Sequence, residues 1–172
     1  MTASGRRVLV VTLHSGEQEF DACCASLARQ TLAPIEHVVI SGLPKMAAHA
    51  ALHRACESRA DTCDVFVKLD ADMVITREDL LERIVERFIS EPELDHLKIA
   101  VQDFYSDRLV GALNAYRSTS RWARVDDNFT TDAGPIDRRA VVEDWTELAP
   151  AAQHSPDPVS YTHLTLPTIL LV

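Results

Sequence analysis

The feature that most constrains the fold is the alternation of short apolar runs with segments of helical periodicity. Three apolar runs rich in β-branched residues predict buried strands at 7–12, 35–40 and 64–69. Between them, apolar residues recur at helical spacing at 20–28, and the alanine-rich segment 45–58 favours a helix. This strand–helix–strand–helix–strand order predicts a parallel sheet with right-handed crossovers and helices on its faces.

The second half of the chain is less regular. Residues 80–89 carry the cleanest amphipathic stripe and predict a third helix, and 97–104 predict a fourth strand. Segment 108–117 is compatible with either a strand or a helix, 121–134 favours a loop that could include a strand, and 138–148 favours a helix. The predicted fold class is α/β, with a three-layer, mostly parallel sheet flanked by helices.

Composition narrows the function classes. The chain has 172 residues, is 47% hydrophobic and carries a net charge of −9, so a nucleic-acid surface is not expected. None of its four cysteines forms a C-x-x-C pair, which favours reduced thiols. Since no apolar stretch reaches membrane-spanning length and no separate signal region precedes the first strand, we expect a cytoplasmic protein without an integral membrane segment. Contact with the inner face of the membrane stays open.

Two carboxylates, Asp70 and Asp72, flank one small residue directly after the third predicted strand. In open α/β sheets, ligands bind at the carboxyl ends of the strands. Two hard oxygen donors there suit a divalent cation that carries phosphate, although a polar turn would use the same residue types. No G-x-G-x-x-G motif and no Walker loop occurs, which disfavours a dinucleotide or P-loop site.

The order of these motifs resembles a family 2 glycosyltransferase with the GT-A nucleotide-sugar fold. Residues 25–34 are similar to the family's S-L-x-x-Q-T-x-x-P segment, and 70–72 stand at its D-x-D position. The resemblance covers roughly residues 7–81 well and the rest poorly. Many members carry acidic residues for the nucleobase after the second strand, whereas this chain has Ser-Gly-Leu-Pro at 41–44. The identity of the nucleotide therefore stays open.

The resemblance implies transfer of a sugar from a nucleotide-diphosphate donor to an unknown acceptor, which could be a glycan, a lipid or a small molecule. It implies an inverting reaction with Mn²⁺ or Mg²⁺ bridging the diphosphate. Asp72 would bind the metal directly, and Asp70 would contact the ribose or reach the metal through water. Thr12, His14 and Ser41, at the ends of the first two strands, would line the nucleotide pocket.

Two further roles fall in the later part of the chain. His154 could supply the late metal ligand seen in many GT-A enzymes. An inverting transfer also needs a carboxylate that takes the acceptor hydroxyl proton. The candidates for this general base are Asp126, Asp127, Asp132, Asp137 and Asp144. Of these, Asp132 and Asp137 are preferred because they fall in a late loop.

Two alternative functions stay open. A haloacid dehalogenase-type phosphatase would use Asp70 as nucleophile and Asp72 as acid/base. That motif normally follows the first strand of its domain, whereas two strand–helix units precede it here. The other alternative is a catalytically inactive fragment that only binds a nucleotide sugar.

The last residues form a separate segment. Residues 159–172 contain no Asp, Glu, Lys or Arg and resemble a translated sequencing adapter. We therefore expect an incomplete GT-A-like domain over 1–158, followed by an artefactual tail. On this interpretation the natural protein continues beyond residue 158.

Overall fold

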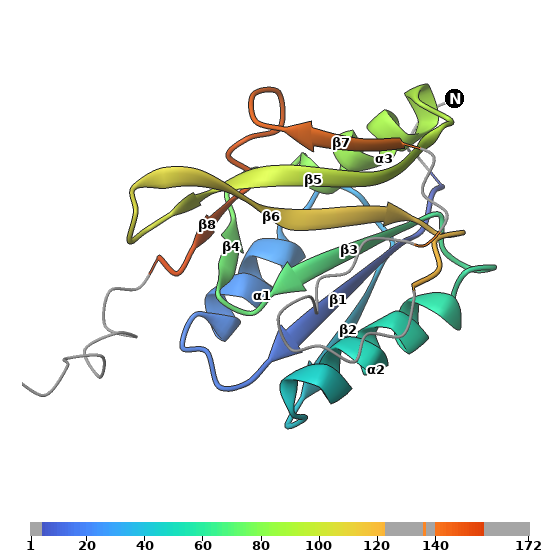
Figure 1. Ribbon diagram of the computed structural model, residues 1–172. Helices are drawn as coiled ribbons and strands as arrows, with labels where there is room; N and C mark the ends of the chain where they lie inside the picture. Colours follow the sequence, from blue (N-terminus) through green and yellow to red (C-terminus); the bar gives the residue numbers. More distant parts are fainter. Residues whose placement is uncertain (1–4, 123–135, 137–139, 157–172) are drawn as a thin grey trace, which may run out of the picture.

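The computed structural model describes residues 5–122, 136 and 140–156 (Figure 1). Within them the chain forms, in order, β1 (Val8–His14), α1 (Phe20–Ala28), β2 (Ile35–Ser41), α2 (Lys45–Glu57), β3 (Val65–Asp70), β4 (Met73–Ile75), α3 (Leu80–Ser90), β5 (Leu94–Asp103), β6 (Arg108–Arg117), β7 (Ala140–Asp144) and β8 (Ala152–His154). The predicted Asp132 and Asp137 and the segment 159–172 lie outside the described residues.

These strands form one sheet in the order β2-β1-β3-β6-β5-β8-β4, with β7 also paired to β5. β1 runs parallel to both β2 and β3, and β7 and β8 run parallel to β5. β6 is antiparallel to both its neighbours, β3 and β5. The sheet curls, so that β4 at its far end packs against α1 (Figure 1). The prediction of a mostly parallel sheet flanked by helices is confirmed.

Alternate residues of the central strands pack on opposite faces of the sheet. Val8 and Val10 of β1 lie in one apolar cluster with residues of α1 and α3. Leu9 and Val11 lie in a second cluster with residues of α2. A parallel strand that is buried on both faces needs apolar residues at every position, which explains the uninterrupted apolar run in β1.

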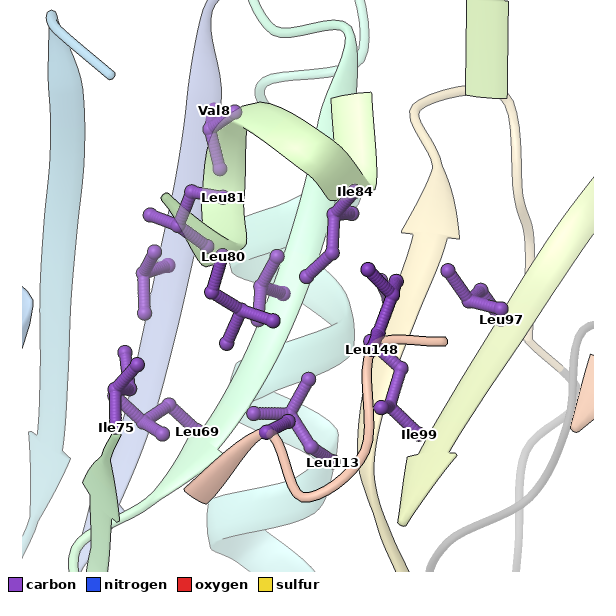
Figure 2. Packing of buried hydrophobic residues seen from close by; sticks show 14 of the residues in the cluster. Val8, Leu69, Ile75, Leu80, Leu81, Ile84, Leu97, Ile99, Leu113 and Leu148 are labelled. Atoms are coloured by element: carbon purple, nitrogen blue, oxygen red, sulfur yellow. The ribbon is translucent and has the colours of Figure 1, made fainter. Parts of the chain in front are cut away.

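The three helices cover the two faces of the sheet. Figure 2 shows Leu80, Leu81 and Ile84 of α3 packed against apolar side chains of the strands. These positions form the amphipathic stripe that the sequence predicts, and all are fully buried. No helix in the described part of the chain is both long and apolar enough to cross a membrane.

The predicted helix at 138–148 is wrong over the residues described. Residues 140–144 instead form β7, which pairs in parallel with β5. The β-branched Val141 and Val142 suit a strand, and the edge of β5 offers backbone partners that local sequence reasoning does not see. Segment 108–117, whose sequence is compatible with either a strand or a helix, forms the strand β6.

Truncation of the α3 stripe tests this packing. Ile84 is fully buried, so Ile84→Ala is expected to lower the free energy of unfolding by about 2–5 kcal/mol through lost burial and a residual cavity. Glu86→Ala, on the exposed side of the same helix, is expected to change it by about 0.5 kcal/mol or less. Chemical denaturation of both variants measures the difference, and similar values for both would contradict this packing.

Candidate functional site

The carboxyl ends of β1, β2 and β3 meet at one edge of the sheet. Leu13 of β1 pairs with Asp70 of β3, and His14 pairs with Ser41 of β2. A cavity of about 430 Å³ opens at this edge. Its polar and charged lining residues are His14, Ser15, Glu17, Lys45, His49, Lys68, Asp70, Asp72 and His154. The predicted location, at the strand ends beside the D-x-D motif, is therefore hollowed and polar.

Asp70, Ala71 and Asp72 connect β3, in the middle of the sheet, to β4 at its far end. The N–H of Ala71 donates to the carbonyl of Leu13 over 3.3 Å, and the Ala71 side chain is buried. A small residue is suited to this position because the link passes close against β1. Both flanking carboxylates line the cavity.

His154 reaches the cavity through the pairing of β8 with β4, in which Met73 lies opposite His154. Its Nε2 lies 3.1 Å from Oδ2 of Asp72, and its Nδ1 lies 2.8 Å from Oδ1 of Asp103. Three of the residues predicted from the sequence, Asp70, Asp72 and His154, thus line one cavity although more than eighty positions separate the first two from the third. Asp103, which the sequence analysis missed, completes the cluster.

Electrostatics at this cluster favour a charged imidazole. The hydrogen bond to Asp72 raises the pKa of His154 to about 9; burial opposes this effect and the bond to Asp103 adds to it. Hydrogen bonds from the Ser106 side chain and from His154 lower the pKa of Asp103 to about 2. At neutral pH His154 is therefore an imidazolium between two carboxylates, which offsets part of the negative charge of the site.

Lys68 is a second basic group that the sequence analysis did not select. It lies on β3, is 7% exposed, lines the cavity and places its Nζ 3.2 Å from Oδ2 of Asp70. Burial of a lysine is rare without an anionic partner, because desolvation penalises the charge. The position of Lys68 within an apolar run is the sequence signal that could have identified it as a candidate site residue. Together with Lys45, it supplies positive charge for an anionic ligand.

The other residues predicted for the nucleotide pocket are placed differently. His14 lines the cavity and stacks on Phe20, with ring centroids 4.1 Å apart. Thr12 is buried, with its hydroxyl 3.0 Å from Nε2 of His37, and does not line the cavity. Ser41 is exposed and does not line it either. The apolar wall is formed instead by Leu13, Ile40, Leu43 and Ala48.

Among the general-base candidates, Asp126, Asp127, Asp132 and Asp137 lie outside the described residues. Asp144 is described and is buried at the end of β7. Its Oδ1 accepts the backbone N–H groups of three consecutive residues, Thr146, Glu147 and Leu148. In this arrangement the Asp144 carboxylate organises the turn that follows β7.

A second cavity, of about 380 Å³, also has Asp70 and His154 in its wall. Its other lining residues come from β4, β5, β6 and β7 and include the ion pair of Lys98 and Glu143, with Nζ and Oε1 3.5 Å apart. A Cβ on Gly111 would lie 2.8 Å from Cε of Lys98, so glycine leaves room for the lysine stem across β6. The two cavities therefore share two wall residues, Asp70 and His154.

The donor atoms around Asp72 have the chemistry of a partial site for a divalent cation. No group of three or more His, Cys, Asp or Glu side chains in the described residues could hold a metal ion by itself. However, Oδ1 of Asp72 is buried and has no hydrogen-bond partner among those residues. Mg²⁺ in particular is often bound by one or two carboxylates and completes its shell with water and substrate phosphates. Asp72 and His154 thus fit a cation that is shared with a phosphate ligand.

Comparison with known proteins places the fold. No protein-family model matches the chain, and no curated protein matches it. Among solved structures, TarS of S. aureus matches 90% of this chain with a TM-score of 0.54 and 10% identity. The 4-diphosphocytidyl-2C-methyl-D-erythritol synthase of Anaerococcus prevotii matches 91% of this chain and 95% of its own, with a TM-score of 0.50 and 7% identity.

A glycosyltransferase involved in the glycosylation of the major capsid of PBCV-1 matches 64% of this chain, with a TM-score of 0.43 and 10% identity. The chain spans 38% of the length of TarS and 59% of the length of that glycosyltransferase. At such identities the likeness shows the fold alone. The chain has a GT-A-like fold.

The charged state of His154 predicts a pH dependence of stability. Because folding raises its pKa from 6.5 to about 9, the stabilisation is complete below pH 6.5 and is lost as pH rises through about 9. In the presence of EDTA, we expect the free energy of unfolding to fall by about 2–3 kcal/mol over this window. His154→Gln should remove this slope, and equal slopes in urea denaturation of both proteins would contradict the ion pairs.

Proposed function

We propose that this chain is a glycosyltransferase domain that transfers a sugar from a nucleotide-diphosphate donor to a hydroxyl acceptor with the help of Mn²⁺ or Mg²⁺. The observation that carries the proposal is the pair of cavities that adjoin at Asp70 and His154. A group transfer between two substrates needs two binding spaces with the reacting atoms at their junction. The GT-A-like fold agrees with this assignment.

The larger cavity suits the donor. Its apolar wall, which includes Leu13, Ile40 and Leu43, offers a surface for a nucleobase. Lys45 and Lys68 on the same cavity offer positive charge for a diphosphate. In a protein with a net charge of −9, these local cations offset the repulsion of an anionic ligand.

In this proposal Asp72 and His154 hold the cation, and Asp70, which is paired with Lys68, faces the ribose or the second shell of the metal. When bound, the cation supplies Lewis-acid stabilisation of the charge that develops on the departing nucleoside diphosphate. Lys68 adds a positive charge on the same side of the site. The roles of the remaining residues concern binding and proton transfer.

The smaller cavity suits the acceptor. Lys98, His96, Asn114 and Glu143 give it both hydrogen-bond donors and acceptors, as a polyhydroxylated molecule requires. For an inverting transfer, a carboxylate removes the acceptor hydroxyl proton while the oxygen bonds to the anomeric carbon and the nucleoside diphosphate leaves. Asp132 and Asp137 remain the proposed candidates for that base.

Nucleotide binding tests the donor site. Isothermal titration of the full chain with UDP, GDP and CDP, with and without Mn²⁺, should reveal one nucleotide whose affinity rises with the metal. Asp72→Asn is expected to weaken the metal-dependent binding by about tenfold or more, because it removes a charged ligand. Asp61→Asn, an exposed aspartate elsewhere, is the matched control. Unchanged binding by Asp72→Asn would contradict the site.

Lys68 gives a sharper prediction, because its role is specific for phosphate. Lys68→Met keeps much of the side-chain volume and removes the charge, so the affinity for the preferred nucleoside diphosphate should fall by about tenfold. The affinity for the corresponding nucleoside should stay within about twofold, because a nucleoside has no phosphate that could form a charge-assisted hydrogen bond with Lys68. Equal losses for both ligands would indicate a general disturbance of the cavity.

Turnover separates a transferase from a binding fragment. Hydrolysis of the nucleotide sugar whose nucleotide binds best, followed by release of the nucleoside diphosphate, would support the enzymatic function. Transfer to a hydroxylated acceptor would support it further. Metal-dependent binding without hydrolysis or transfer would indicate a domain that binds the donor only.

A further inference from the structure

Both ring nitrogens of His154 are engaged, each by a different carboxylate. Nε2 faces Asp72, the proposed metal ligand, at 3.1 Å, and Nδ1 faces Asp103 at 2.8 Å. A histidine ring can rotate and can carry its proton on either nitrogen, so a second partner is needed to fix its orientation and tautomer. Asp103, which lines neither of the two cavities, is placed to provide this constraint.

Asp103 is itself held rigidly. It is the last residue of β5, where it lies beside His154 in the parallel pairing with β8. The N–H of Phe104 donates to the carbonyl of His154 over 3.2 Å, so the two backbones are joined at this point. The backbone that carries Asp103 is therefore joined directly to that of His154.

The turn after β5 fixes the second oxygen of this carboxylate. Oδ2 of Asp103 accepts two hydrogen bonds from Ser106, one from the backbone N–H at 2.8 Å and one from the hydroxyl at 2.6 Å. Oδ1 is left to face Nδ1 of His154. The side chain of Asp103 is only 14% exposed, which limits competition from water.

We propose that Asp103 is a positioning residue for metal binding: its carboxylate accepts the Nδ1–H of His154 and thereby directs Nε2 toward the cation shared with Asp72. This inference rests on the proposed function. A carboxylate behind a ligating histidine fixes the tautomer and raises the basicity of the nitrogen that binds the metal. The Asp103 carboxylate, at the end of β5, would thus support the site through His154 without binding the cation itself.

Binding of Mn²⁺ alone to the full chain tests the inference, with free Mn²⁺ followed by electron paramagnetic resonance at fixed pH. Asp103→Ala should weaken binding by about 10–100-fold, and Asp103→Asn by a smaller factor, because an amide oxygen can still accept the Nδ1–H. Asp107→Asn is the matched control: it lies in the same turn, keeps a residue type that tolerates its positive φ of 50°, and its Oδ1 accepts a hydrogen bond from Gln102 rather than from His154.

A spectroscopic signature separates positioning from general structure. In the wild type, electron spin echo modulation should show a ¹⁴N coupling between Mn²⁺ and the imidazole, and His154→Gln should abolish it. The coupling should weaken in Asp103→Ala and be retained in part in Asp103→Asn, both variants being compared at a temperature at which circular dichroism shows them folded. Normal Mn²⁺ affinity and normal ¹⁴N coupling in both Asp103 variants would overturn the inference.

The same experiment distinguishes failure of the inference from failure of the proposed function. If the wild type binds Mn²⁺, and Asp72→Asn and His154→Gln lose it but the Asp103 variants do not, the metal site stands and the role of Asp103 is wrong. If the wild type shows no Mn²⁺ binding, alone or with UDP, GDP or CDP, the metal-dependent function itself is wrong, and the inference is overturned with it.

Discussion

Burial of β1 and β3 on both faces is the constraint on which the rest of the structure depends. Alternate side chains of these strands enter two separate apolar clusters, one under α1 and α3 and the other under α2. Parallel strands in a sheet that is covered by helices on both faces end at a common edge, and the polar residues that follow these strands lie at that edge. Asp70 and His14 reach the same cavity for this reason, and the hydrophobic core thereby fixes where the site can form.

The site itself depends on a second, smaller element, the pairing of β8 with β4. This pairing carries His154 to Asp72, while β5 brings Asp103 to the other side of the imidazole. The result is a row of alternating charges, carboxylate–imidazolium–carboxylate, which is stable only because each charge has a partner at hydrogen-bond distance. A cation that binds Asp72 and His154 would take over the role that the imidazolium proton has in this structure.

Local patterns were sufficient for the first half of the fold but not for the second. The strands before residue 70 and the α3 stripe could be predicted because apolar runs and helical spacing are properties of consecutive residues, whatever their partners in space. The segment at 140–144 could not, since its strand conformation depends on the distant edge of β5. The same reason explains Thr12: its place at the end of β1 suggested a ligand contact, yet its hydroxyl faces His37 of the neighbouring strand.

The sequence by itself determined the α/β class and the position of Asp70 and Asp72 at a strand end, and the family resemblance added His154 as a candidate ligand. Periodicity and strand-end position are properties of consecutive residues, so they can be read without coordinates. Only the tertiary structure decided that His154 meets Asp72, that Lys68 is paired with Asp70, that Asp103 supports His154, and that two cavities adjoin at these side chains. These contacts join separate strands, and their geometry is set by sheet pairing and core packing rather than by local sequence.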